Sequence, residues 1–160
     1  MKADYTIRCI EPRDNEAVEK IIRSCLIEFG GDHEGTAWAD PMLGRFSEVY
    51  SADCSRYWVA EDIGGKVVGG CGIGPLDSEG LCELQKMYLL PEARGTGLAQ
   101  KLMKLALEFA SEHYTRCYIE TLENMTAAQR FYRRCGFVRI YDPPVRTEHY
   151  ACGVRYIKEL

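Results

Sequence analysis

A short loop that contains two glycines has the residue types to bind an anion. It comprises Arg94, Gly95, Thr96, Gly97, Leu98 and Ala99, between an apolar run at 81–90 and helix-forming residues at 97–113. The start of a helix leaves amide N–H groups unpaired and carries partial positive charge. Glycines let the backbone turn sharply and approach a ligand without a Cβ in the way. The loop therefore indicates either an ordinary strand-to-helix turn or a phosphate site, and the two roles are compatible.

Two familiar phosphate-binding loops do not match this segment. A Walker A loop requires GxxxxGK followed by Ser or Thr, and no lysine follows Gly97. A dinucleotide fingerprint, GxGxxG, requires a third glycine or alanine where Gln100 stands. A third pattern fits, namely Arg or Gln, two residues, Gly, one residue, and Gly or Ala. Arg94, Gly97 and Ala99 satisfy it.

A second motif lies downstream at the spacing that this third pattern requires. The segment "ENMTAAQRFYRRCGF", residues 123–137, supplies Asn124, Ala127, Phe131, Tyr132, Gly136 and Phe137. Together with "KMYLLPEARGTG", residues 86–97, it resembles the GNAT superfamily of acyl-CoA-dependent N-acetyltransferases. The resemblance covers nearly the whole chain and is strongest over residues 82–138, whereas the N-terminal third matches only in the order of its elements.

The resemblance implies that acetyl-CoA is the cofactor and that its pyrophosphate lies on the loop at 94–99. Arg94 would contact the phosphate or pin the loop. The backbone of Met87 and Leu89 would bind the pantetheine arm beside a bulge, with the amide of Met87 as oxyanion donor. Asn124 would hydrogen-bond the cofactor arm, or serve as a turn residue. The implied cofactor-binding set is Met87, Leu89, Arg94, Gly95, Thr96, Gly97, Leu98, Ala99, Asn124, Ala127 and Tyr132.

Direct acetyl transfer to an amine requires a base for the ammonium and an acid for the leaving thiolate. The resemblance implies Tyr132 as the acid, since a phenol with a pKa near ~10 is protonated at neutral pH. The alternative is a core tyrosine beside Phe131. Glu83 lies four residues before Met87, where histone-acetylating members carry a glutamate base. Burial in an apolar strand should raise its pKa. Glu120, a water chain, or a structural role for Glu83 remain alternatives.

Two loops, at 29–50 and 141–150, are expected to select the substrate. The predicted substrate-binding residues are Phe29, His33, Trp38, Glu83, Glu120, Arg146 and His149. Acidic and aromatic groups suit a cationic amine, and Arg146 could hold a substrate carboxylate. We therefore predict a small primary amine, an amino acid or a related compound. Protein lysines or N-termini, a non-catalytic acetyl-CoA sensor, and simple solvated loops are the alternatives.

Composition limits the class of protein and its partners. With 160 residues, 46% of them hydrophobic, the chain suits one domain over 1–160. A net charge of −4 argues against a nucleic-acid partner, although Arg130, Arg133, Arg134 and Arg139 lie close in sequence. No signal-peptide core and no run of roughly 20 apolar residues is present, so we expect a cytoplasmic protein without a membrane partner. The resemblance also allows a homodimer.

Eight cysteines are scattered through the chain without a CxxC pair. They are Cys9, Cys25, Cys54, Cys71, Cys82, Cys117, Cys135 and Cys152. This spacing predicts neither zinc nor a disulfide scaffold, and we expect mostly buried free thiols.

Hydrophobic periodicity predicts an order of β, α, α, β, β, β, α, β, α, β, β. The expected strands lie at 5–10, 56–61, 66–73, 81–90, 116–121, 137–140 and 151–160. The expected helices lie at 14–30, capped by Asp14, at 42–50, at 97–113 and at 126–136. Leu98, Leu102, Leu105 and Phe109 should share one apolar face. The predicted fold class is α/β: a mixed, mostly antiparallel sheet, similar to that of GNAT proteins, with helices on both faces.

Overall fold

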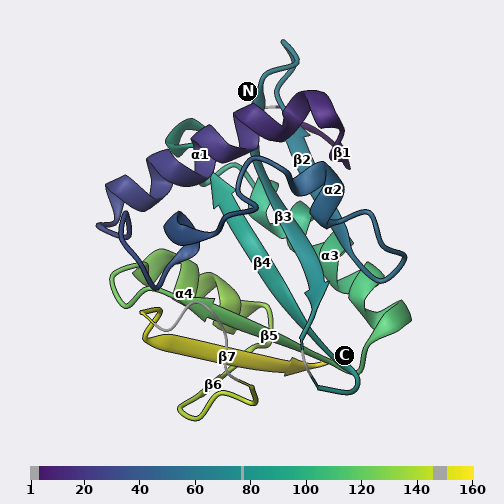
Figure 1. The fold of residues 1–160 in the computed structure, drawn as a ribbon, viewed down its shortest axis with the longest axis vertical. Coiled ribbons are helices and arrows are strands. Elements are labelled where there is room, and N and C mark those ends of the chain that lie inside the picture. Colours follow the sequence, from purple (N-terminus) through teal and green to yellow (C-terminus); the bar gives the residue numbers. More distant parts are fainter. Residues whose placement is uncertain (1–3, 77, 146–150) are drawn as a thin grey trace.

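A seven-stranded sheet forms the centre of the computed structural model, which describes residues 4–76, 78–145 and 151–160 (Figure 1). The strand order is β1-β2-β3-β4-β5-β7-β6. Among the neighbouring pairs in the described residues, β4 and β5 are parallel to each other and the other pairs are antiparallel. The strands are β1 (Thr6–Cys9), β2 (Arg56–Glu61), β3 (Val67–Pro75), β4 (Leu81–Leu89), β5 (Arg116–Thr121), β6 (Val138–Ile140) and β7 (Val154–Glu159). The predicted mixed, mostly antiparallel sheet is confirmed.

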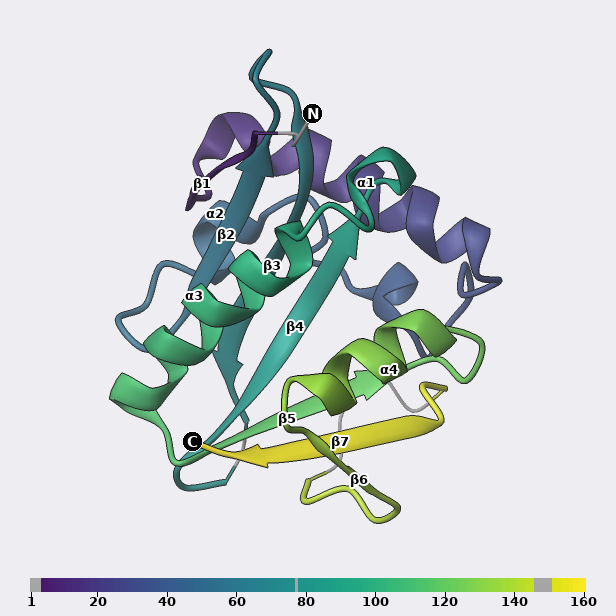
Figure 2. The same cartoon turned by 180° about the vertical axis from the view of Figure 1, so that it is seen from behind.

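Helices cover both faces of the sheet, as the sequence predicted. The helices are α1 (Asn15–Glu28), α2 (Phe46–Val49), α3 (Leu98–His113) and α4 (Thr126–Arg134). Figures 1 and 2 show α1 and α2 on one face, and α3 and α4 on the other. Each face has its own apolar core, because side chains of successive strand residues point to opposite sides. Three short 3-10 turns, Pro12–Asp14, Ala37–Ala39 and Pro91–Ala93, complete the described elements.

The helix α3 is buried along a face that differs slightly from the predicted one. Leu98, Leu102 and Phe109 are buried, whereas Leu105, on the same predicted face, is 37% exposed. Ala106 and Met103 are buried instead. Consecutive helix residues are turned by about 100°, so Leu105 lies at the margin of an arc that centres on Ala106.

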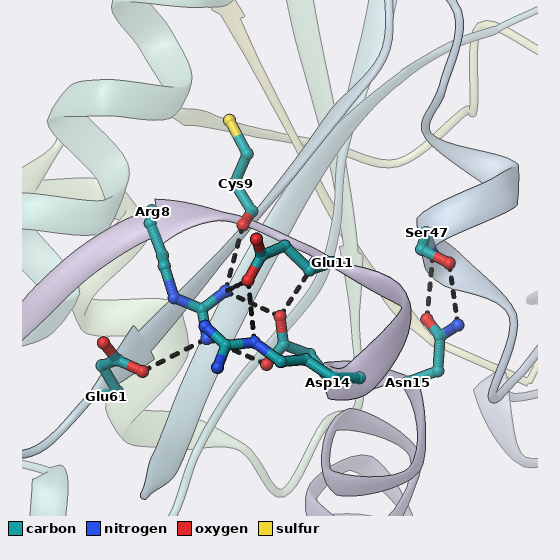
Figure 3. Close-up of polar contacts among 8 residues, drawn as sticks. Arg8, Cys9, Glu11, Asp14, Asn15, Ser47 and Glu61 are labelled. Atoms are coloured by element: carbon teal, nitrogen blue, oxygen red, sulfur yellow. Dashed lines mark hydrogen bonds and ion pairs between the residues drawn. The ribbon is translucent and has the colours of Figure 1, made fainter. Parts of the chain in front are cut away.

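Asp14 is the N-cap residue of α1, as predicted, but its side chain does not provide the cap. The Asp14 carboxylate makes no capping bond to the helix. It accepts hydrogen bonds from the Arg8 guanidinium at 2.7 and 2.9 Å and from the Glu11 amide at 2.8 Å (Figure 3). A charged donor on β1 therefore outcompetes the helix amides. On the next residue, Asn15 exchanges two hydrogen bonds with Ser47 and ties α1 to α2 (Figure 3).

All eight cysteines are free thiols, and five of them are buried. This confirms the expectation for Cys25, Cys71, Cys82, Cys117 and Cys152, whereas Cys9 and Cys54 are exposed. In the described part of the chain, no helix has the length and apolar character needed to cross a membrane.

Candidate active site

A gap in the sheet between β4 and β5 creates the candidate site. The two strands pair only where Leu81 to Glu83 lie beside Arg116 to Tyr118, and they then run apart (Figure 1). A narrow cleft, partly open to solvent, lies along this divergence. Residues of both strands line it, with contributions from α1, from α4 and from the loop between α1 and α2. The open edge of β4 thus gives a ligand access to the backbone.

A β-bulge interrupts β4 beside the cleft. Two residues, Lys86 and Met87, oppose the single residue Cys71 on β3. Lys86 has a positive φ of 52°, an unfavourable backbone conformation for a residue with a side chain. The Tyr57 hydroxyl donates to the Lys86 carbonyl at 2.9 Å, and the Lys86 ammonium lies 3.3 Å from the carboxylate of Asp40. These contacts hold the bulge in place.

The backbone direction of β4 after the bulge agrees with the predicted roles of Met87 and Leu89. The Leu90 amide donates to the Val68 carbonyl, toward β3. Because strand residues alternate, the amides of Met87 and Leu89 point to the opposite edge, which β5 has left. Unpaired backbone groups on such an edge can bind an extended ligand arm as a further strand would.

The loop at 94–99 has the geometry of an anion cradle. Gly95 and Gly97 have φ values of 71° and 88°, and a Cβ placed on either would meet no atom within 4 Å. Within the described residues, the amides of Gly95, Thr96 and Gly97 donate to no backbone carbonyl. They precede the N-terminus of α3, whose first amides also lack helical acceptors. The open space and these free donors fit a pyrophosphate group.

Arg94 pins this loop to α1. Its two terminal nitrogens bind the Glu28 carboxylate at 2.7 and 2.8 Å, and its Nε donates to the Leu89 carbonyl at 3.1 Å. The guanidinium also lies 5.6 Å from the centre of the Phe29 ring. Of the two roles predicted for Arg94, the structure therefore shows the pinning of the loop.

Glu83 lies at the point where β4 and β5 separate. Its side chain is 4% exposed and lines the cleft. Burial raises the pKa of this carboxyl to about 7, and the nearby Glu120 adds to the increase. A hydrogen bond from Gln85 Nε2, at 2.8 Å, and the charge of Lys86 act in the opposite direction. A carboxylate with this pKa can accept a proton near neutral pH.

Tyr132 lines the same cleft from α4. It is 6% exposed and packs against Phe131, Phe137 and Tyr156, so it is also part of the core. Burial raises the pKa of its hydroxyl well above the usual range, so the phenol is protonated at neutral pH. Tyr132 is therefore a core residue that also lines the cleft, and its role as the acid stays a prediction.

The remaining predicted residues take different positions. Asn124 donates from Nδ2 to the Phe29 carbonyl at 2.6 Å, which joins the end of α1 to the loop before α4. Ala127 is exposed on the first turn of α4, and Glu120 lines the cleft and accepts from the Tyr118 hydroxyl at 2.7 Å.

Of the loop residues, Phe29, His33 and Trp38 do not line the cleft. His33 is exposed beside the Glu34 carbonyl, and the Trp38 ring lies 4.6 Å from the Arg23 guanidinium. Arg146 and His149 lie outside the described residues. All of these substrate-binding assignments stay predictions.

Several residues that line the cleft were not predicted from the sequence. Thr36, Ala37, Gln85, Lys86, Met125 and Cys152 all line the cleft. A signal for Gln85 was present, because it lies two residues after Glu83 and so shares its face of the strand. Among the described residues, no group of three or more His, Cys, Asp or Glu side chains is placed to hold a metal ion.

Comparisons with known proteins agree with this geometry. The sequence model described as "Acetyltransferase (GNAT) family" matches residues 16–137. The chain is 42% identical over 158 residues to the Escherichia coli K12 protein named "Uncharacterized N-acetyltransferase YjgM", covering 96% of this chain and 94% of that protein.

Two solved structures share the fold at 20% identity. An acetyltransferase of the GNAT family from Staphylococcus aureus Mu50 has a TM-score of 0.87, with 98% of this chain and 99% of that chain covered. A phosphinothricin acetyltransferase from Sinorhizobium meliloti, in complex with AcCoA, has a TM-score of 0.75, with 100% and 89% covered. The family match over most of the chain and the close E. coli relative together establish that this chain belongs to the GNAT family of N-acetyltransferases and is an acyltransferase.

Proposed function

We propose that the protein transfers the acetyl group of acetyl-CoA to the primary amine of a small molecule, an amino acid or a related amine, by direct attack in a ternary complex. The observation that carries this proposal is the placement of Glu83, a buried carboxyl with a pKa of about 7, in the cleft that Met87 and Tyr132 also line. The AcCoA complex of the S. meliloti structure supports the choice of cofactor.

Acetyl-CoA, when bound, supplies a thioester carbonyl that an amine can attack. The loop amides around Gly95 and Gly97 would hold its pyrophosphate, and the open edge at Met87 and Leu89 would hold its arm. Met87 lines the cleft, and the loop follows β4 after the short turn Pro91–Ala93.

The chain's own residues provide the proton transfers and the oxyanion donor. Glu83 accepts a proton from the ammonium form of the substrate, because its pKa leaves it about half ionised at pH 7. The Met87 amide offers a donor at the open edge for developing negative charge on an oxygen. Tyr132 holds a proton at Oη that can pass to a departing group.

A small acceptor is favoured by the shape of the cleft. Water-sized molecules have only about 40 Å³ of room within it, so the cleft is narrow. Glu83, at 4% exposure, is reachable only by a slender group. The second candidate acceptor is a protein lysine or N-terminus. The other alternative is that the protein binds acetyl-CoA as a sensor without catalysis.

A panel of amines assayed for release of the CoA thiol tests the proposal. The panel should hold free amino acids, diamines, amino-acid amides, and peptides with either a lysine or a free N-terminus. We expect turnover with a free small amine and loss of most of it in Glu83→Gln. Turnover with peptides alone would identify a protein acetyltransferase. Binding of acetyl-CoA without turnover of any amine would identify a sensor.

A further inference from the structure

We propose that Gln85, oriented by Tyr50, is a positioning residue that holds the Glu83 carboxylate ready to accept a proton. This inference rests on the role proposed above for Glu83. Neither Gln85 nor Tyr50 contributes to the predicted cofactor site, and the two residues come from different elements: Gln85 lies on β4, and Tyr50 follows α2.

A chain of two hydrogen bonds leads to Glu83. The Tyr50 hydroxyl donates to Gln85 Oε1 at 2.6 Å, and Gln85 Nε2 donates to Glu83 Oε1 at 2.8 Å. The two ends of a carboxamide are fixed relative to each other, so a donor at Oε1 keeps the NH₂ group facing Glu83. A donor that faces a carboxylate favours its ionised form, which is the form that accepts a proton.

Tyr50 is itself held firmly. Its side chain is 8% exposed, and its ring lies 5.4 Å from that of Phe46 and 5.3 Å from that of Tyr57, between centroids. Aromatic contacts of this kind restrict the ring to one orientation. Without the Tyr50 hydroxyl, the Gln85 amide could turn its oxygen toward Glu83, and that arrangement would favour the protonated acid.

Glycines in β3 make the space for this chain of hydrogen bonds. Gly72 and Gly74 lie on the neighbouring strand, in register with Gln85 and Glu83. A Cβ on Gly74 would lie 2.7 Å from Gln85 Oε1, and a Cβ on Gly72 would lie 2.8 Å from the Tyr50 ring. Glycine inside a strand is unfavourable and often marks a close approach by another group. Here the groups that approach are the side chains of Gln85, Tyr50 and Tyr57, whose ring would lie 2.7 Å from a Cβ on Gly72.

Other charged and titratable groups also surround Glu83. Tyr118 and Glu120 lie on β5, Lys86 on β4 with its partner Asp40, Arg155 on β7 opposite Glu120, and the thiols of Cys117 and Cys152 lie nearby. Glu120 raises the pKa of Glu83, whereas Lys86 lowers it. Substitution of Gln85 or Tyr50 by a neutral residue leaves all of these groups in place, so their effects cancel in a comparison with the wild type.

Three variants test the proposal. Gln85→Met retains the length of the side chain but removes the donor, and Tyr50→Phe removes only the hydroxyl. Tyr114→Phe is the control, because its hydroxyl binds the Cys54 carbonyl and Tyr114 does not line the cleft. The pKa of Glu83 is measured by ¹³C NMR of its carboxyl carbon without substrate, and kcat/KM is measured from pH 5.5 to 9.

We expect Gln85→Met to raise the pKa of Glu83 by about one pH unit, since a hydrogen bond to a charged group is among the stronger ones. Tyr50→Phe should move it less, in the same direction, and Tyr114→Phe should not move it. The pH at which kcat/KM falls on the acid side should rise by the same amount as the pKa of Glu83. At pH 6 the Gln85→Met enzyme should be about tenfold less active than the wild type, and at pH 9 the two should be nearly equal.

An unchanged titration of Glu83 in folded Gln85→Met would overturn the proposal. If that variant does not fold, an unchanged titration in Tyr50→Phe would do the same. A shifted titration with an unmoved kcat/KM profile would show instead that Glu83 is not the proton acceptor. In that case the proposed function of Glu83 would fail, and Gln85 would have no catalytic role. The hydrogen bond between Gln85 and Glu83 would still be confirmed by the shifted titration.

Discussion

Replacement of Glu83 by glutamine should change how the stability of the protein depends on pH. Glu83 is 4% exposed, and burial raises its pKa from the ordinary 4.5 to about 7. Between these pH values the folded protein holds a proton that the unfolded chain has released. Glutamine resembles the neutral acid in shape but does not titrate, so the variant lacks this proton exchange.

The size and sign of the effect follow from linkage. A difference of about 2.5 pH units, at about 1.4 kcal/mol each, corresponds to about 3 to 4 kcal/mol. Because the folded pKa is raised, the contribution of Glu83 to the free energy of unfolding is complete below pH 4.5. It is lost as the pH rises through 7. We therefore expect the wild type to lose about 3 to 4 kcal/mol relative to Glu83→Gln between pH 4.5 and pH 8.

Urea unfolding of both proteins at a series of pH values from 4.5 to 8 measures this difference. The matched control is Glu108→Gln, which removes one negative charge from the exposed side of α3. Parallel stability profiles for the wild type and Glu83→Gln would show that Glu83 is ionised in the folded protein throughout this range. Its assignment as a base with a pKa of about 7 would then be refuted, without any reference to the identity of the substrate.

Two further predictions concern the cofactor loop and Tyr132. Acetyl-CoA should raise the melting temperature, by an amount equivalent to about 2.7 kcal/mol at one hundred times its Kd. In scanning calorimetry, Gly97→Ala should abolish that shift. Gly65→Ala is the control and should retain it, because Gly65 has a similar φ (84° against 88°) and a Cβ there would also meet no atom within 4 Å. Tyr132→Phe should lower kcat by at least about 100-fold with an unchanged Kd for acetyl-CoA by calorimetric titration; an unaltered kcat would exclude Tyr132 as the acid.

The sequence was sufficient for the features that depend on local patterns. Strand alternation and helical periodicity predicted the observed order of elements, because the burial of one face governs both. The loop around Gly95 and Gly97 was predicted from residue type, since both residues adopt positive φ values that glycine alone accepts readily. Glu83 and Tyr132 lie 49 residues apart in the sequence and were both predicted, and the fold brings both to one cleft.

The features that the sequence did not predict depend on contacts between distant residues. Arg94 is turned toward Glu28, 66 residues away, and Asn124 binds the backbone of Phe29, 95 residues away. Neither partner could be identified from spacing. Asp14 occupies the predicted capping position, but Arg8 binds its carboxylate. Leu105 has the right residue type for the core and lies at the edge of the buried arc, where a small rotation of α3 decides its exposure.

Two features beside β4 shape the site: the early end of its pairing with β5, and the glycines of the neighbouring strand β3. On the β5 side, pairing ends at Glu83, so the amides of Met87 and Leu89 are available to a ligand. On the β3 side, Gly72 and Gly74 have no side chains, which leaves space for Tyr50 and Gln85. The Tyr50 hydroxyl binds Gln85, and Gln85 binds Glu83. Full pairing and larger residues would stabilise the sheet but would close both routes. One strand therefore fixes the proposed proton acceptor, Glu83, and the proposed backbone donors, Met87 and Leu89, relative to each other.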